Sequence, residues 1–268
     1  MNTIVLAAII VGAVGIIIGI LLGIAGKIFH VEVDERVGLV REQLPGNNCG
    51  GCGYAGCDAL AKAIVAGEAP ANACTAGCTA ENYAEIGNIM GVSVEAGEKM
   101  VMHVRCGGTC DAVRYKYNYF GPRDCRQAAV TPGRGPQVCT YGCFGFGSCE
   151  KVCEFDAIRV VNGVAVVDPD RCVNCGKCIE TCPNNVIERI PYEKAVFINC
   201  NNKERGKAVK DACDNGCIGC GLCAKNCESG AITMENNLPV FDYSKCTACG
   251  KCVEKCPVGG LRLKGAIQ

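Results

Sequence analysis

A run of four closely spaced cysteines followed by a proline constrains this chain more than any other feature. Residues 172–183 read Cys-Val-Asn-Cys-Gly-Lys-Cys-Ile-Glu-Thr-Cys-Pro, which gives the spacing C-x2-C-x2-C-x3-C-P. The same spacing returns in residues 246–257. Thiols this close together are poorly placed to reach distant partners, but they can surround one inorganic cluster.

The spacing is typical of bacterial-type ferredoxins. There, the first three cysteines bind one 4Fe-4S cube, and the fourth, before proline, reaches across to a second cube. Cysteine makes up 26 of the 268 residues, which in a short secreted chain would suggest disulfides. The repeated spacing favours clusters instead. Because iron–sulfur thiolates need a reducing compartment, we expect the cysteine-bearing domains in the cytoplasm.

Charge and motif content argue against several other classes of protein. The 27 basic and 27 acidic residues balance, and no basic run suggests a nucleic-acid partner. Neither G-x-x-x-x-G-K-[ST] nor a strand followed by G-x-G-x-x-G is found. We therefore expect no nucleotide bound by this chain, no nucleic acid and no bond-making active site of its own.

The N-terminal segment is apolar. Residues 2–26 contain no charged side chain and would span about 37 Å as a helix at ~1.5 Å per residue, against ~30 Å of hydrocarbon. A signal peptide fits poorly because no basic region precedes the apolar run. We predict a transmembrane helix over residues 1–27. Since basic side chains first appear at Lys27, we expect a single pass through the cytoplasmic membrane, with the bulk of the chain on the cytoplasmic side.

Small residues recur along this segment. Gly15, Gly19 and Gly23 are four residues apart, a spacing that lets another membrane helix approach closely. An ordinary anchor is the simpler alternative. We expect a packing face for other membrane subunits.

A first group of cysteines follows a charged linker at residues 28–45. Residues 46–80 contain the spacing C-x2-C-x4-C-x16-C, and the glycines among the first cysteines can aim backbone N–H groups at cluster sulfurs. Structural zinc sites favour two separated C-x2-C pairs instead. We predict a 4Fe-4S domain whose cluster 1 is held by Cys49, Cys52, Cys57 and Cys74.

Residues 81–135 form a connecting region with extra cysteines. A helix over Ala80 to Met90 and a short strand over Lys99 to Val104 are predicted, with His103 on the strand as a structural residue rather than a ligand. Three cysteines of this region have no recognisable ligand spacing: Cys106, Cys110 and Cys125.

The rest of the chain is a duplication. A shift of 74 residues, from Cys172 to Cys246, superposes eight cysteines of residues 136–195 on eight of residues 196–268. Each copy should contain a hairpin, with turns at Asn162-Gly163 and near Asn236-Asn237. The predicted fold class is α+β: one transmembrane helix, a small 4Fe-4S domain and two tandem 2×(4Fe-4S) ferredoxin-like units.

The crossed pattern of ligation assigns thiols to each unit. In unit 1, Phe146 stands where unit 2 has Cys220, and Cys139 is the nearest replacement; a three-iron or absent cluster is the alternative. The predicted sets are Cys139, Cys143, Cys149 and Cys182 for cluster 2, Cys172, Cys175, Cys178 and Cys153 for cluster 3, Cys217, Cys220, Cys223 and Cys256 for cluster 4, and Cys246, Cys249, Cys252 and Cys227 for cluster 5.

Six cysteines lie outside these five sets: Cys78, Cys106, Cys110, Cys125, Cys200 and Cys213. The sequence suggests a sixth cluster between the two units, with buried free thiols as the alternative. Its predicted ligands are Cys106, Cys125, Cys200 and Cys213.

Two glutamates replace the expected prolines. Glu154 follows Cys153 and Glu228 follows Cys227. Because a carboxylate opposes added negative charge, we expect these sites to differ in potential from those that keep the proline.

The order of these parts resembles the B subunit of the Rnf complex. The apolar N-terminal helix, the segment Leu-Pro-Gly-Asn-Asn-Cys-Gly-Gly-Cys-Gly-Tyr-Ala-Gly-Cys ending at Cys57, the distal Cys74 and the ferredoxin repeats carry the resemblance over nearly the whole chain. The doubled unit resembles cysteine-rich forms from anaerobes. The resemblance implies a subunit of a translocase, the ion-translocating ferredoxin:NAD+ oxidoreductase, which couples electron transfer to export of Na+ or H+.

In that family this chain would be a relay. The resemblance implies that soluble ferredoxin donates electrons, which pass through five or six 4Fe-4S clusters to membrane subunits. Entry at the C-terminal domains is inferred from chain order. Two alternatives stay open: a membrane-tethered polyferredoxin serving another acceptor, such as a cytochrome or a redox regulator, and a structural zinc–cysteine scaffold.

Overall fold

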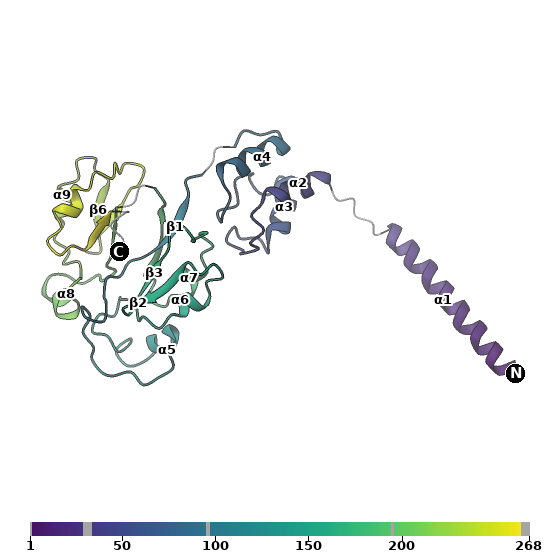
Figure 1. Cartoon of the computed structure of the whole chain (residues 1–268), viewed down its shortest axis with the longest axis horizontal. Coiled ribbons are helices and arrows are strands. Elements are labelled where there is room, and N and C mark those ends of the chain that lie inside the picture. The colour runs from purple at the N-terminus through teal and green to yellow at the C-terminus, as the bar shows by residue number, and fades with distance from the viewer. Residues whose placement is uncertain (1, 29–33, 95–96, 194–195, 264–268) are drawn as a thin grey trace.

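The computed structural model describes the chain except residues 1, 29–33, 95–96, 194–195 and 264–268 (Figure 1). In the first helix, side chains are described from Ile10 to Ile24. Figure 1 shows a long N-terminal helix, a small helical domain and a larger body of short strands and helices.

Helix α1 (Asn2–Ile28) contains the apolar N-terminal segment. Across the described residues, no helix combines the length and the apolar character that crossing a membrane requires. The transmembrane helix predicted over residues 1–27 is corrected by this finding. The described structure also places no atom within 4 Å of a Cβ on Gly15, Gly19 or Gly23.

The small domain contains α2 (Glu35–Gln43), α3 (Cys57–Val65) and α4 (Ala80–Met90). Helix α4 has the predicted bounds and begins at a capping box, in which the Thr79 hydroxyl accepts the Asn82 N–H at 3.3 Å. Helix α2 comes from the predicted linker. It packs on α3 and α4, and its Val40 is fully buried.

Two hairpins form where the sequence predicts them. Strands β2 (Ile158–Val161) and β3 (Val164–Val167) pair in unit 1, and β6 (Ile232–Glu235) and β7 (Leu238–Phe241) pair in unit 2. The two turn residues of each hairpin have positive φ, which two-residue turns of this kind require: 45° and 79° at Asn162 and Gly163, and 49° and 64° at Asn236 and Asn237.

Each unit is closed by a second strand pair. Strand β1 (Met100–Val104), predicted in the connecting region, pairs antiparallel with β4 (Ile187–Pro191) of unit 1. Strand β5 (Val196–Ile198) pairs in the same way with β8 (Leu261–Leu263) of unit 2. The connecting region therefore contributes structurally to unit 1.

Short helices place the third cysteine of each ferredoxin motif. Helices α6 (Ser148–Lys151), α7 (Lys177–Thr181), α9 (Leu222–Lys225) and α10 (Lys251–Glu254) all follow a glycine in the left-handed conformation. That conformation turns the chain sharply into the helix and favours glycine. It buries the cysteines Cys149, Cys178, Cys223 and Cys252. The described residues also form helices α5 (Cys125–Ala129) and α8 (Lys207–Ala212).

Candidate iron–sulfur sites

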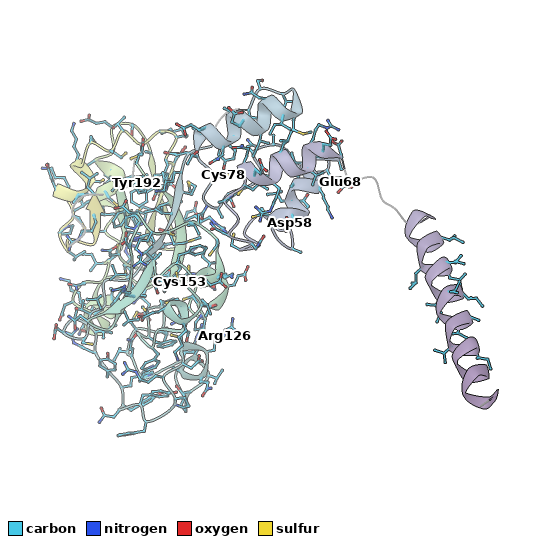
Figure 2. The ribbon with its side chains drawn as sticks, turned by 45° about the vertical axis from the view of Figure 1, so that its right-hand side comes forward. Asp58, Glu68, Cys78, Arg126, Cys153 and Tyr192 are labelled. Atoms are coloured by element: carbon cyan, nitrogen blue, oxygen red, sulfur yellow. The ribbon has the colours of Figure 1, made fainter. Side chains whose placement is uncertain are left out.

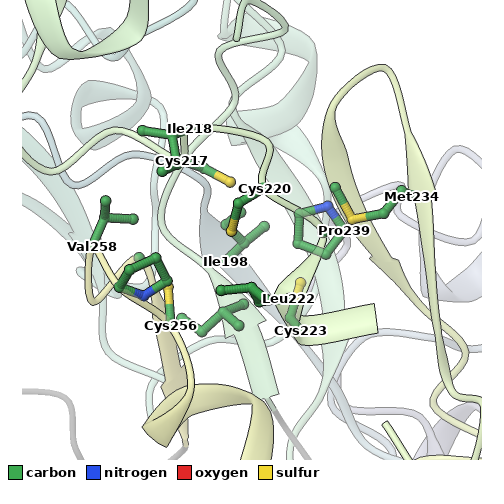
Figure 3. Close-up of a pocket in the computed structure, with 14 residues that line it drawn as sticks. Ile198, Cys217, Ile218, Cys220, Leu222, Cys223, Met234, Pro239, Cys256 and Val258 are labelled. Atoms are coloured by element: carbon green, nitrogen blue, oxygen red, sulfur yellow. The ribbon is translucent and has the colours of Figure 1, made fainter. Parts of the chain in front are cut away.

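Four cavities are each lined by four thiols. The first, of about 360 Å³, lies in unit 2 and contains the whole set predicted for cluster 4 (Figure 3). Apolar side chains from β5 and β8, Ile198 and Leu261, also line it. Its thiols are Cys217, Cys220, Cys223 and Cys256.

A second cavity, of about 350 Å³, contains the set predicted for cluster 3 in unit 1: Cys153, Cys172, Cys175 and Cys178. Backbone N–H groups point at two of the sulfurs: Ala157 donates to Cys153 Sγ at 3.4 Å, and Met102 of β1 donates to Cys172 Sγ at 3.5 Å. Burial raises the pKa of Cys178 to about 12. Iron would offset this cost, because a coordinated thiol is deprotonated by the metal.

A third cavity, of about 330 Å³, lies on the other side of unit 1. It brings together Cys143, Cys149 and Cys182 as predicted, but its fourth thiol is Cys125 rather than Cys139. The Ser148 hydroxyl accepts the Cys125 N–H at 2.8 Å and fixes the start of α5 beside α6.

Phe146, at the position of the missing cysteine, packs in an aromatic group instead. Its ring stacks with Tyr119 at 5.2 Å and with Phe144 at 6.4 Å. Cys125 thus reaches the cavity from the connecting region, where spacing offers no signal.

A fourth cavity, of about 370 Å³, contains Cys139, which the sequence assigned to cluster 2. Cys106, Cys200 and Cys213 line the same cavity. The sequence grouped the last three with Cys125. One signal pointed to the observed grouping: Cys139 superposes on Cys213 under the 74-residue shift, so these two cysteines have equivalent positions in the duplicated units.

The cluster 5 thiols lie at the end of unit 2. Cys227, Cys246 and Cys252 belong to one apolar cluster, and Cys249 is exposed. A hydrogen bond from Ser229 lowers the pKa of Cys227, and backbone N–H groups add to this effect.

The cluster 1 thiols lie in the small domain. The N–H of Cys57 donates to Asn48 Oδ1 at 2.8 Å at the start of α3. A hydrogen bond from the Cys78 thiol lowers the pKa of Cys74 to about 6, which favours its thiolate. Cys78 is thus a neighbour of the predicted set, and Figure 2 shows it on this domain, away from Cys153 of unit 1.

Two observations bear on other metal chemistry. In the described part of the chain, no group of three or more His, Cys, Asp or Glu residues is arranged to hold a single metal ion. His103 Nε2 lies 3.2 Å from the Ile198 carbonyl oxygen, and its ring packs on Phe197.

Each glutamate that replaces a proline has a cationic partner. Lys177 Nζ lies 2.6 Å from Glu154 Oε1, and Lys251 Nζ lies 2.5 Å from Glu228 Oε1. The carboxylate charge beside each site is therefore countered, which reduces the effect on potential that the sequence suggests.

Family models match three segments of the chain. One described as a putative Fe-S cluster matches residues 44–76, a 4Fe-4S binding domain matches residues 165–188, and a 4Fe-4S dicluster domain matches residues 216–260. Together with the four-thiol cavities, these matches define a ferredoxin-type protein that binds several 4Fe-4S clusters.

Curated relatives resemble most of the chain. The B subunit of the Na+-translocating ferredoxin:NAD+ oxidoreductase complex of Acetobacterium woodii is 45% identical over 92% of this chain and 74% of the relative. The proton-translocating counterpart of Clostridium ljungdahlii is 43% identical over 92% of this chain and 87% of the relative. The B subunit of the ion-translocating oxidoreductase complex of Methanosarcina acetivorans is 38% identical over 88% and 89%. The chain belongs to this family, the B subunits of Rnf complexes, which confirms the resemblance.

Proposed function

We propose that this chain is the electron-relay subunit of an ion-translocating ferredoxin:NAD+ oxidoreductase. In this role it accepts electrons from reduced ferredoxin and delivers them to other Rnf subunits, where NAD+ reduction is coupled to translocation of Na+ or H+. Bound 4Fe-4S clusters would supply the one-electron redox chemistry. The thiols of this chain would hold them and set their order.

The observation that carries this proposal is the serial arrangement of the thiol sets. At one end, Gly51 of the small domain packs on unit 1, since a Cβ there would lie 2.9 Å from the Cys175 carbonyl oxygen. Burial raises the pKa of Cys175, and the neighbouring Cys49 adds to the rise. Asn174 Nδ2 also donates to the Thr75 carbonyl oxygen at 3.2 Å. The cluster 1 and cluster 3 thiols are therefore adjacent.

Within each ferredoxin unit, the two sets are also neighbours. Burial raises the pKa of Cys149 to about 12, with a contribution from Cys178 across unit 1. Burial likewise raises the pKa of Cys252 to about 11, with a contribution from Cys223 across unit 2. Each unit can thus pass an electron between its own two sites.

We further propose that electrons enter at unit 2. Its Cys220 and Cys249 are exposed, whereas the cysteines of unit 1 are buried or half-buried. A docked ferredoxin could approach these two sites closely. In this direction of flow, the small domain is the exit towards the other subunits.

Two variants of the full complex test the direction. Cys249→Ala should slow reduction of the whole chain by ferredoxin, because it disrupts the entry site. Cys52→Ala should leave that reduction rapid but abolish NADH formation, because it disrupts the exit. Cys110→Ala is the control, since Cys110 is exposed and lines none of the four cavities. Rapid crosslinking of ferredoxin to the domain around Cys49, rather than to residues 139–268, would contradict this direction.

We also propose that the chain works at the cytoplasmic membrane, with its cysteine domains on the cytoplasmic side, because their thiolates need a reducing compartment. The described apolar side chains of α1, from Ile10 to Ile24, are exposed and offer a contact for other Rnf subunits. Deleting residues 2–28 should release the chain from the complex. Retention of the shortened chain by the purified complex would oppose this assignment.

A further inference from the structure

The cavity between the two ferredoxin units is built from segments that are far apart in the sequence. Cys106 follows β1, Cys200 follows β5 and Cys213 ends α8, whereas Cys139 precedes the first motif of unit 1. Its empty volume of about 370 Å³ is close to the 360, 350 and 330 Å³ of the other three cavities. The cavity is therefore similar in empty volume to the other three cavities that four thiols line.

Burial distinguishes these thiols from surface cysteines. Cys139 and Cys200 are 7% exposed and Cys213 is 8% exposed. Free buried cysteines normally pack as small apolar side chains in a dense interior. Here three of them, together with the half-buried Cys106, line a hollow, which is the arrangement of the neighbouring cluster sites.

Hydrogen-bond donors point at the sulfurs of this cavity. Cys106 Sγ accepts the N–H of Gly108 at 3.4 Å and the N–H of Cys143 at 3.3 Å. Asn202 donates its N–H to Cys200 Sγ at 3.5 Å and its side-chain amide to Cys139 Sγ at 3.7 Å. Such donors stabilise negative charge on sulfur, as cluster thiolates require.

Glycine leaves the room that a cluster needs. A Cβ on Gly142 would lie 3.5 Å from Cys139 Sγ and 3.7 Å from Cys106 Sγ. Gly107, Gly108 and Gly216 line the same cavity. A side chain at Gly142 would project towards these two thiols.

We propose that Cys106, Cys139, Cys200 and Cys213 hold a sixth 4Fe-4S cluster, and that Cys125 instead completes the unit 1 site with Cys143, Cys149 and Cys182. The four thiols lose their protons on binding, and the iron and sulfide come from cluster assembly in the cell. This inference extends the relay proposed above.

The sixth site lies between the two units. On the unit 1 side, Cys106 accepts the N–H of Cys143, a thiol of the adjoining cavity. On the unit 2 side, Cys200 lies close enough to Cys217 to contribute to its raised pKa, and Cys217 lines the cavity with the cluster 4 thiols. A cluster here would join the clusters of the two ferredoxin units into one series for electron transfer.

The test is iron and acid-labile sulfide per chain in anaerobically purified full-length protein. Wild type should contain about 24 iron atoms, four for each of six cubes. Cys200→Ala combined with Cys213→Ala should lose about four of them. Adding Cys139→Ala should remove no more, whereas adding Cys125→Ala should remove further iron, because it disrupts a different site.

Three results would overturn the inference: about 20 iron atoms in wild type, unchanged iron in the Cys200→Ala, Cys213→Ala double variant, or further loss from Cys139→Ala but none from Cys125→Ala. Cys110→Ala serves as the matched control and should keep all iron. Because the wild-type count needs no substitution, a variant that fails to fold leaves the test intact. Iron content is independent of electron delivery, so a failure of the relay would not alter these counts.

Discussion

The backbone N–H of Cys143 donates to the sulfur of Cys106 at 3.3 Å. These two residues belong to different cavities, and Gly142 lines both of them. Backbone atoms, rather than a layer of side chains, therefore lie between the two neighbouring cavities. This short separation favours rapid electron transfer between unit 1 and the site that joins it to unit 2.

Phe146→Cys should compensate for the loss of Cys125. Position 146 is equivalent to Cys220, which lines the corresponding cavity of unit 2. Cys125→Ala should therefore lose iron, and the double variant with Phe146→Cys should regain it, as measured by iron content and low-temperature EPR of the reduced protein.

The control for this rescue is Phe146→Cys in a Cys139→Ala background. Because Cys139 lines a different cavity, a cysteine at position 146 should give no rescue there. Rescue of Cys139→Ala in place of Cys125→Ala would restore the ligand set that spacing alone predicted.

Gly51→Ala should uncouple the small domain from unit 1. The added Cβ would lie 2.9 Å from a backbone oxygen and 3.1 Å from the Cα of Cys175, so the backbone contact between the two domains must shift. We expect wild-type iron content but slower NADH formation by the complex, by roughly tenfold if the lost contact is worth about 1.4 kcal/mol. Gly97→Ala, which meets nothing within 4 Å, should match wild type.

Lys177→Gln should lower the reduction potential of the unit 1 site at Cys153, Cys172, Cys175 and Cys178. Without the lysine, the Glu154 carboxylate is left uncompensated, and negative charge disfavours an added electron. Because the pair is partly exposed, the expected shift is on the order of tens of millivolts in an EPR-monitored titration.

Lys251→Gln provides the matched test in unit 2, since Lys251 pairs with Glu228 in the same way. Its effect should fall on the site at Cys227, Cys246, Cys249 and Cys252. A change in the potentials of the other unit in either variant would show that the ion pairs do not act locally.

His103 should make stability depend on pH. Burial lowers its pKa to about 4, with a smaller contribution from Arg105, so the folded protein holds it neutral. The unfolded chain protonates near pH 6.5. Stability is therefore complete above about pH 6.5 and falls as the pH drops towards 4, by up to about 3 kcal/mol.

The measurement is the difference in unfolding free energy between wild type and His103→Gln. Comparing the two proteins cancels the acid sensitivity that their clusters share. The difference should change between pH 7 and pH 4.5. A difference that stays constant with pH would show that the imidazole has the same pKa in the folded and the unfolded chain.

Sequence reasoning succeeded where a short pattern determines local structure. The turns at Asn162-Gly163 and Asn236-Asn237, the helix at Ala80–Met90 and the strand that ends at Val104 all follow from local chemistry. The thiols that spacing grouped as clusters 3 and 4 also each line one cavity.

Sequence reasoning did not show that Cys125, rather than Cys139, lies with the other three thiols of the unit 1 cavity. Cys139 is nearer in sequence to the unit 1 motif, but the chain folds Cys125 against it through Ser148. Such a placement depends on tertiary packing between distant segments, which spacing does not encode. Hydropathy also predicted a membrane span over the apolar N-terminal segment, and the described structure does not support that prediction.

The most direct measurement of the central claim is freeze-quench EPR of the full chain after mixing with reduced ferredoxin. The signal of the small domain is identified by its loss in Cys52→Ala. In wild type that signal should develop after those of unit 2. In the Cys200→Ala, Cys213→Ala variant the unit 2 signals should still appear while the small-domain signal is delayed by at least tenfold. A small-domain signal that develops at the wild-type rate in this variant would contradict a single series of clusters through the site between the units.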